Sequence, residues 1–514
     1  MNGRWAAIVA ILLSGCASVV QDTPGGPANS AEAGGTETPS PPAGLDGGWR
    51  LDCTLGAASG WNQTCLACLS DTPRTKAEMW VGINPTDPAN VVVAAKDMDP
   101  ASSDGCVWNG LWVTHDAGGN WTHVVIGGRF ADRTPASPFY GYSCNTDPMF
   151  RFAPDGTLHY GVEMYNLKRL GGTAGHNGPV DQALAPTGLA VGSDLTTLTF
   201  KVLLATSRDG GLTWPDVLVW QPDLGTITDF GRMAIAPDGA VHEILNHLGP
   251  GLACHLLSSR DGGRTADPVV VVTPPEAPGD ILCRGLAISP SGTLVVAFKG
   301  PIVAPGVVVP GGARGGQVMF VRSADGGRTF TDSNVAWRME PLPPMPGKAQ
   351  AGPSEFEMAY DLTSGPGRGT LWAITAEAPD GDADVFVRSS HDDGRTCSDP
   401  VQVNQPSKNA QVMPNLAIVG DGSLHAFYFD RAGDPDNRLT GITHAWSVDA
   451  GATWRQENAT TALWDPDLGR HQLGDPWIGD YLGIDAVGQD VWAAFPDASL
   501  GGEPVAAAAH VRRR

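Results

Sequence analysis

The sequence predicts an all-β fold, a β-propeller of four-stranded antiparallel blades. Two alternating sequence elements and the composition predict it. One element, a Ser/Thr-x-Asp turn, recurs six times, and the other, a hairpin, recurs seven times. The 66 glycines and 42 prolines among 514 residues are typical of short strands joined by tight turns. No long stretch has the 3.6-residue apolar periodicity of a helix.

The chain begins with the features of a bacterial lipoprotein signal peptide. Arg4 precedes an apolar stretch at residues 6–13 that is too short to span a bilayer. The stretch ends in Leu13-Ser14-Gly15-Cys16, which resembles a lipobox, whose cysteine is lipidated. A secretory signal with a chance cysteine is the alternative. We expect residues 1–16 to be the signal peptide and lipobox. Because no Asp follows Cys16, we expect the outer membrane of the cell envelope.

Residues 17–48 are rich in Gly, Pro, Ser, Thr and Glu, with few large apolar residues to bury, so we expect a disordered tether there. Residues 49–514 are expected to form the propeller. Within them, each hairpin is a strand, a turn of the Pro-Asp-Gly type and a second strand. The pattern is clear in five copies and looser in two, at residues 79–93, 149–160, 233–239, 286–292, 416–422, 358–362 and 482–486.

The second element follows a third apolar strand, as in Ser207-Arg208-Asp209-Gly210-Gly211-Leu212-Thr213-Trp214. Its Asp is expected to accept hydrogen bonds from the turn's own backbone, and its glycine to supply positive φ. The aromatic residue is expected to pack under the turn. The six aspartates are Asp116, Asp209, Asp261, Asp325, Asp392 and Asp449.

A hairpin, a third strand, the Asp turn and a fourth strand make one blade. The seventh unit stops at its third strand, residues 506–511, so we expect the segment near Trp49 to Cys53 to supply the missing strand and close the ring. Seven blades are favoured. Six remain the alternative because the spacing between Asp116 and Asp209 is irregular.

Eight cysteines remain besides Cys16, an even number that indicates disulfides in an exported chain, although eight cysteines allow 105 pairings. Cys106 with Cys144, and Cys254 with Cys283, are the favoured pairs. For Cys65-x-x-Cys68, structural bridging is favoured over a redox role, because no βαβ pattern surrounds it.

The formal charge of −22 argues against nucleic acid and anionic lipid surfaces as partners. It fits solubility outside the cell, or binding of cationic groups. We expect a monomer whose partner is an extracellular glycan or an envelope protein, and whose membrane contact is the Cys16 lipid alone. The sequence contains no nucleotide-binding loop, zinc motif or Ser-His-Asp arrangement.

The six Asp turns resemble the Asp box (BNR repeat) of sialidase-like propellers, a group that includes sialidases, lectins and assembly factors. The resemblance implies that the Asp boxes are structural and lie on the face away from the ligand. It also implies an arginine clamp for a substrate carboxylate, a tyrosine nucleophile with a glutamate base, and an aspartate acid. The family's Arg-Ile-Pro motif is missing, since the chain reads Pro73-Arg74-Thr75. The positions that match these roles are Tyr481 (nucleophile), Glu357 (base), Asp99 (acid/base) and the arginines Arg74, Arg232, Arg284 and Arg431.

The starts of the innermost strands carry acidic residues, independently of any family. All innermost strands of a propeller run parallel around the axis, so their starts meet at one end of the channel. We expect these residues there: Glu78, Asp147, Asp229, Asp280, Glu355 and Asp480, with Asn415 in the remaining blade. Such a ring favours a cation, a cationic group or a hydroxyl-rich glycan. The alternative is that these side chains cap backbone amides between blades.

No cofactor is required by these patterns. Asp380, Asp382 and Asp384 are spaced as in a calcium loop, but the other EF-hand positions are absent, so a solvated turn is favoured and calcium is the alternative. Two functions remain for the chain. One is an envelope-anchored module that binds or hydrolyses extracellular glycans, as an exo-sialidase if it is an enzyme. The other is a non-catalytic scaffold for protein assembly.

Overall fold

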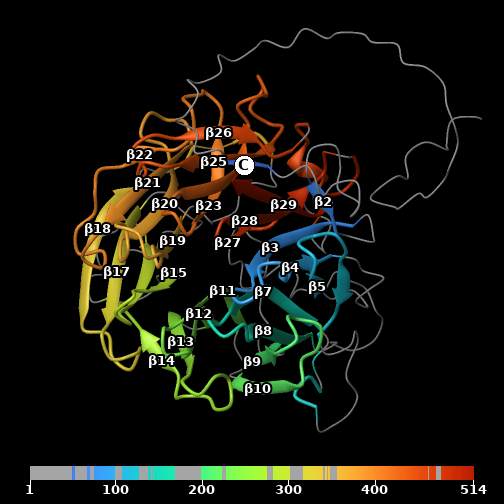
Figure 1. Cartoon of the computed structure of the whole chain (residues 1–514), viewed down its shortest axis with the longest axis vertical. Coiled ribbons are helices and arrows are strands. Elements are labelled where there is room, and N and C mark those ends of the chain that lie inside the picture. The colour runs from blue at the N-terminus through green and yellow to red at the C-terminus, as the bar shows by residue number, and fades with distance from the viewer. Residues whose placement is uncertain are drawn as a thin grey trace, which may run out of the picture.

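The computed structural model is a seven-bladed β-propeller, as predicted, with seven antiparallel sheets around one axis (Figure 1). Its innermost strands contact one another around the whole ring, including β27 with β3. The structure describes residues 49–51, 66–69, 74–98, 107–126, 137–140, 142, 144–167, 198–222, 227–249, 251–274, 282–300, 316–339, 342–343, 345–347, 356–460, 462–470, 476–499 and 501–513.

Six blades are each made of four consecutive strands. The first three are β3 (Lys76–Ile83), β4 (Val91–Asp97), β5 (Trp108–Thr114) and β6 (Thr122–Val124); β7 (Cys144–Phe152), β8 (Leu158–Leu167), β9 (Leu198–Ser207) and β10 (Asp216–Gln221); and β11 (Ile227–Ile235), β12 (Val241–Gly249), β13 (Gly251–Ser259) and β14 (Val270–Val272). The next three are β15 (Leu282–Ile288), β16 (Leu294–Gly300), β17 (Gly316–Ser323) and β18 (Asp332–Met339); β19 (Phe356–Tyr360), β20 (Leu371–Glu377), β21 (Asp384–Ser390) and β22 (Val401–Gln402); and β23 (Gln411–Ile418), β24 (Leu424–Asp430), β25 (Gly441–Ser447) and β26 (Arg455–Asn458).

The seventh blade joins the two ends of the described chain. Its inner strands are β27 (Gly483–Val487), β28 (Asp490–Asp497) and β29 (Val505–Arg513), and a 3₁₀ helix, η2 (Pro466–Leu468), precedes them. The N-terminal strand β1 (Trp49–Leu51) pairs antiparallel with β29, and β2 (Leu66–Cys68) pairs with an earlier part of β29. The predicted closure by the N-terminal segment is confirmed, and the six-blade alternative is wrong.

Each blade is an antiparallel meander, and this connectivity separates the two faces of the ring. All innermost strands begin at one face. The turn between a third and a fourth strand therefore lies at the opposite face, because strand direction alternates within a blade. The six Asp turns and the starts of the innermost strands lie at opposite ends of the channel.

The Asp turns are held by the hydrogen bonds that their residues predict. Asp209 Oδ1 accepts from the Thr213 N–H (2.9 Å) and from the Ser207 hydroxyl (2.8 Å). The Gly211 N–H donates to Ser207 Oγ (2.9 Å), and the Trp214 indole N–H donates to the Gly211 carbonyl (3.1 Å). The backbone bond to the Asp carboxylate recurs at Asp116, Asp261, Asp325, Asp392 and Asp449.

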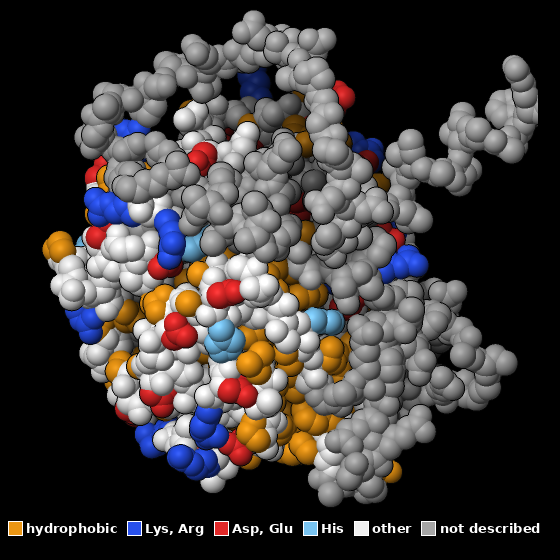
Figure 2. Space-filling view, turned by 45° about the vertical axis from the view of Figure 1, so that its right-hand side comes forward, with side chains coloured by type: hydrophobic (Ala, Val, Ile, Leu, Met, Phe, Trp, Pro, Cys, Tyr) orange, Lys and Arg blue, Asp and Glu red, His pale blue; other side chains and the backbone are white. Residues whose placement is uncertain are grey.

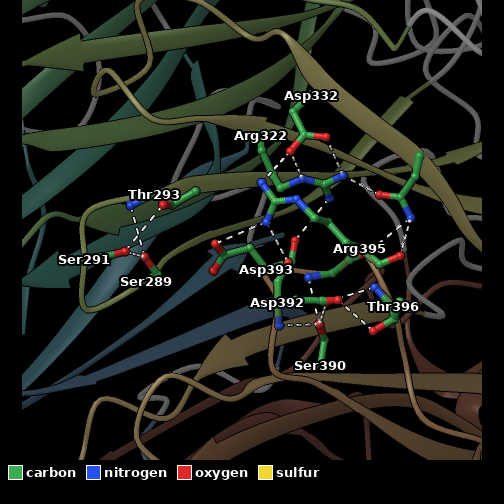
Figure 3. Close-up of polar contacts among 12 residues, drawn as sticks. Ser289, Ser291, Thr293, Arg322, Asp332, Ser390, Asp392, Asp393, Arg395 and Thr396 are labelled. Atoms are coloured by element: carbon green, nitrogen blue, oxygen red, sulfur yellow. Dashed lines mark hydrogen bonds and ion pairs between the residues drawn. The ribbon is translucent and has the colours of Figure 1, made fainter.

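One such turn also links neighbouring blades (Figure 3). Asp392 accepts from the Ser390 hydroxyl (2.8 Å) within the turn between β21 and β22. Arg322, on β17 of the preceding blade, donates to the Asp393 carbonyl of the same turn (3.1 Å) and to Asp332 Oδ2 (3.0 Å). The turn therefore connects two blades as well as closing its own hairpin.

The apolar core lies between adjacent blades. On β9, Val202, Leu203, Leu204 and Ala205 are all 0 % exposed. Side chains on both faces of this strand are buried, because its blade is packed between two neighbours. Full burial of one such aliphatic side chain stabilises the fold by about 1.5–3 kcal/mol. Large rings fill the same layer, and Trp80, Trp112, Trp220 and Trp492 are among the largest buried side chains.

One of the two favoured disulfides is confirmed in the third and fourth blades. Cys254 on β13 and Cys283 on β15 are bonded, with their Cα atoms 5.7 Å apart. Cys68 and Cys144 are also disulfide-bonded. Among the cysteines in the described part of the chain, Cys397 is free and half-buried. The predicted partner of Cys144 and two other cysteines lie outside the described residues: Cys106, Cys53 and Cys65.

The surface of the ring mixes chemical types. On the side shown in Figure 2, acidic, basic and apolar side chains are interspersed. The described residues include no helix that is long and apolar enough to cross a membrane. The predicted signal peptide with Cys16, and the predicted tether, lie outside the described residues.

Candidate functional site

Five of the seven innermost strands contain a β-bulge. The register with the second strand shifts within residues 77–80, 146–149, 229–232, 283–285 and 412–415. At three bulges a non-glycine residue has positive φ: Glu78 (51°), Asp147 (48°) and Met413 (53°). Such backbone costs on the order of 1–3 kcal/mol per residue and is common at functional sites, where a bulge redirects a side chain. The repeated bulge makes the end of the channel at the strand starts the candidate site.

Two adjacent bulges bring Glu78 and Asp147 together, with Lys96 of β4 between them. Lys96 Nζ lies 2.6 Å from Asp147 Oδ1 and also forms an ion pair with Glu78. The ammonium lies 5.2 Å from the centroid of the Trp477 ring. All three charged side chains are buried. The lysine therefore supplies the counter-charge that two buried carboxyl groups require.

Glu78 and Asp147 differ in protonation. Burial raises the pKa of Glu78 well above its usual value, and the Asp147 carboxylate raises it further. Burial acts in the same sense on Asp147, but Lys96 and hydrogen bonds with Glu78 and Asp229 outweigh it and hold the pKa of Asp147 below its usual range. At neutral pH we expect a protonated Glu78 that donates to an ionised Asp147.

Asp229, Arg284 and Asp480 form the part of this cluster that solvent reaches. All three side chains lie inside the ring with protein on several sides. Solvent still reaches them, since Asp229 is exposed and Arg284 and Asp480 are partly exposed. The surrounding protein raises the pKa of Asp229, and Asp147 adds to that shift. Burial also raises the pKa of Asp480 to about 6, against the opposing effect of Lys96 and Arg284. A ligand that enters the channel from this end would meet these three side chains.

A buried ion pair lies beside this group. Arg232 Nε donates to both carboxylate oxygens of Glu357, at 3.0 and 3.1 Å. The guanidinium carbon of Arg232 lies 4.7 Å from the centroid of the Tyr481 ring and 5.4 Å from that of Trp80. Burial raises the pKa of Glu357, and Arg232 opposes the shift. The positive charge of Arg232 is therefore already balanced by Glu357 and stacked on aromatic faces.

Tyr481 is buried next to the carboxyl cluster. Its ring meets that of Trp80 edge to face, with the centroids 6.0 Å apart. Burial raises the pKa of the Tyr481 phenol well above its usual value, and Glu78 and Asp147 raise it further. The phenol is therefore protonated at neutral pH. Asp147, which is ionised, adds to this effect because its negative charge disfavours a phenolate.

A second pair of carboxyl groups, Glu163 of β8 and Glu243 of β12, lies between the second and third blades. Glu163 accepts from the Thr228 hydroxyl (2.8 Å), whereas neither oxygen of Glu243 has a hydrogen-bond partner among the described residues. Burial raises the pKa of Glu243 to about 8. Two glycines make room for the Glu243 carboxyl group. A Cβ on Gly231 would lie 2.8 Å from Glu243 Oε1, and a Cβ on Gly161 would clash with the same carboxyl group.

The structure brings most of the predicted channel residues into one cluster. The predicted residues that lie around Lys96 and Arg232 are Glu78, Asp147, Asp229, Arg284, Glu357, Asp480 and Tyr481. Asn415 instead donates to the Leu482 carbonyl of the next blade (2.9 Å). Three predicted site residues lie outside the described residues: Asp99, Asp280 and Glu355.

Two predicted arginines have other partners. Arg74 is exposed and pairs with Glu503 at 3.4 Å. Arg431 is fully buried and donates to the carbonyls of Pro346 (2.8 Å) and Asn437 (2.6 Å). Its acidic neighbours are Asp467, Asp434 and Asp465. Arg431 therefore neutralises a loop outside the cluster.

Sequence reasoning missed three charged residues of the site: Lys96, Glu163 and Glu243. Each stands in a second strand among apolar residues, as in Val91-Val92-Val93-Ala94-Ala95-Lys96. A charge inside such a strand is rarely buried without a partner. A charged residue inside an apolar second strand was therefore the sequence signal that could have identified these three site residues.

No metal site follows from the described residues, because none of them form a group of three or more His, Cys, Asp or Glu side chains that could hold a metal. Asp382 accepts from the Ala383 N–H (3.0 Å), and Asp384 accepts from Asn404 Nδ2 (2.7 Å). The solvated turn favoured at Asp380, Asp382 and Asp384, and its alternative, a calcium site, both stay predictions.

The chain is similar to solved structures at low sequence identity. No family model and no curated protein matches it. A protein of unknown function from Dyadobacter fermentans is 14% identical, with a TM-score of 0.45, over 91% of this chain and 100% of that chain. The Hadza microbial sialidase Hz136 is 16% identical, with a TM-score of 0.43, over 82% of this chain and 76% of that chain. Trypanosoma rangeli sialidase is 12% identical, with a TM-score of 0.41, over 69% of this chain and 52% of that chain, so the match spans about half its length. The fold assignment rests on the strand topology, and the function is inferred from the channel residues.

Proposed function

We propose that this chain is a glycan-directed propeller of the sialidase-like, Asp-box group, and that it binds and hydrolyses glycans at the channel end lined by Asp229, Arg284 and Asp480. One observation carries the proposal. Solvent reaches a group of ionisable side chains that lies within the protein beside Tyr481 and two arginines, Arg232 and Arg284. Hydroxyl-rich ligands are recognised by a few polar groups placed in such a setting.

The raised pKa of Asp480 indicates which group can act as the acid in glycoside hydrolysis. Burial raises the pKa of Asp480 to about 6, so near neutral pH this carboxyl group can hold and release a proton. We assign Asp480 as the acid and Tyr481 as the nucleophile. Glu357 is reassigned from base to positioning residue, because it holds Arg232.

The test is turnover of fluorogenic glycosides by the domain that begins near residue 48. The panel contains a sialoside, an N-acetylglucosaminide, a glucosaminide and a galactoside. We expect turnover of at least one, with kcat lowered about 100-fold or more by Tyr481→Phe and by Asp480→Asn. The exposed Asp436→Asn serves as the matched control. Retained turnover in both site variants would refute these roles.

A non-catalytic scaffold is the second candidate, and the outer strands favour it. Val219 of β10, Val271 of β14 and Val335 of β18 are 41%, 57% and 40% exposed. These β-branched side chains lie on the outermost strands of their sheets, and such strands can pair with another chain. A folded protein that turns over no glycoside and binds nothing on a glycan array would favour this function over the first.

We further propose that a lipid on Cys16 holds the propeller at the outer membrane. The order of residues 1–16 supports it. The measurement is incorporation of an alkyne-labelled fatty acid into the full chain and into Cys16→Ala. Labelling that persists in the variant would refute the lipid site, and an unlabelled, secreted wild-type chain would refute the anchor.

A further inference from the structure

The positive charges of the site are largely balanced within the protein. Lys96 is paired with two carboxyl groups, Glu78 and Asp147. Arg232 is paired with Glu357 through both carboxylate oxygens. A clamp for an anionic sugar needs guanidinium groups that can turn their charge to the ligand. In the described part of the channel, both of these cations instead compensate buried carboxylates.

Acidic side chains outnumber basic ones among the described residues on the solvent-reached side. Asp229 and Asp480 contact solvent there, and Arg284 is a described cation that acts on both. Oδ1 of Asp480 is buried and accepts no hydrogen bond from the described residues.

A further carboxyl group lies behind these two. Glu163 is 0 % exposed, and its Oε1 has no hydrogen-bond partner among the described residues. Burial raises the pKa of Glu163 well above its usual value, and Asp147, Glu243 and Asp229 raise it further. Carboxyl groups enclosed in this way favour any ligand that brings a positive charge, because the interaction is screened less than in water.

We propose that the ligand group recognised at this end of the channel is a protonated amine on an otherwise neutral sugar, as in a deacetylated amino-sugar oligomer. The inference rests on the proposed glycan function and names its substrate class. An ammonium donates three hydrogen bonds, which suit Asp229, Asp480 and a sugar or backbone acceptor. A sugar carboxylate at the same place would face Asp147, Asp229 and Asp480 and would be repelled.

Binding of such a cation must displace protons from the site. The groups that face Asp480 are Glu78 of β3, Lys96 of β4, Asp147 of β7, Asp229 of β11 and Arg284 of β15. Burial raises the pKa of Asp480 to about 6, and the surrounding protein and Asp147 raise the pKa of Asp229. An ammonium stabilises the ionised forms, so protons leave as it binds. Its affinity should therefore rise as the pH increases through 6, as long as the amine stays protonated.

The experiment is calorimetric titration of the full chain with three matched probes. These are a glucosamine oligomer, the same oligomer fully N-acetylated, and sialyllactose. At pH 6.5 we expect the free amine to bind about 10-fold or more tightly than the acetylated oligomer, and sialyllactose to bind weakest. In two buffers of different ionisation enthalpy, binding of the amine should release protons and binding of the acetylated oligomer should not.

Variants locate the effect. Asp480→Asn should remove most of the preference for the amine and most of the proton release. Asp436→Asn should change neither. Equal binding of the two oligomers, or tighter binding of sialyllactose, would overturn the amine inference and leave the glycan function standing. If none of the probes bound to folded protein, both proposals would fail.

Discussion

Glu243 is the buried group whose replacement should change stability most simply with pH. Its side chain is 0 % exposed, neither oxygen is hydrogen-bonded within the described residues, and burial raises its pKa to about 8. The folded state keeps a proton that the unfolded chain releases above its ordinary pKa of about 4.5. The wild type therefore has its full stability below pH 4.5 and loses stability as the pH rises to 8. Each pKa unit corresponds to 1.36 kcal/mol, so the loss reaches about 3 kcal/mol at pH 7.

Glu243→Gln keeps the shape of the side chain and removes the titration. The difference in unfolding free energy between variant and wild type should therefore move in favour of the variant by about 3 kcal/mol between pH 4.5 and pH 7. For a domain of roughly 450 residues that corresponds to about 3 °C in the thermal midpoint. Thermal unfolding of both proteins at several pH values measures it, with the exposed Asp436→Asn as control. A difference between Glu243→Gln and wild type that stays constant over this pH range would refute the reasoning.

Three further outcomes follow from the described contacts. Glu357→Gln leaves Arg232 buried without its carboxylate and should cost about 3–5 kcal/mol of stability, whereas the double variant Arg232→Met/Glu357→Leu should recover most of that loss. Denaturant unfolding measures both, and an equal loss of stability in the single and double variants would contradict this. Cys283→Ser opens the disulfide to Cys254 and should cost about 3 kcal/mol of stability, and a thermal midpoint equal to that of the oxidised wild type would contradict this. Asp392→Ala removes the acceptor of an Asp turn and should cost about 1 kcal/mol without changing ligand affinity, because the turn lies at the far face; lost affinity in a stable variant would be inconsistent with that placement.

The blades could be predicted from sequence because their determinants are local. Ser207, Asp209 and Gly211 make one another's hydrogen bonds within five residues, so the turn can be read without knowledge of the rest of the chain. Six copies at blade spacing then imply a repeat fold. The strand supplied by β1 could also be inferred, since the seventh unit lacks one.

The site was less predictable, because its contacts join residues far apart in the chain. Lys96 binds Asp147 across a blade boundary, and nothing near Lys96 in sequence indicates that partner. Arg431 could not be distinguished from Arg232 by residue type. Carbonyl groups and loop aspartates hold Arg431, whereas Glu357 holds Arg232 in the channel. The bulges at Glu78 and Asp147 depend on twist and closure of the ring, which no local pattern specifies.

The pairing of β1 with β29 has a consequence for the order of folding. Every other blade can form from neighbouring strands as soon as they are synthesised, because its contacts are short in sequence. The last blade must bring Trp49 opposite Arg513, across nearly the whole folded chain. During synthesis the first strand therefore waits without its partner until the final one arrives. We therefore expect ring closure to be the last step of assembly. Loss of β1 would expose the edge of β29, and loss of β29 would expose the edge of β28, and either edge could pair with other chains.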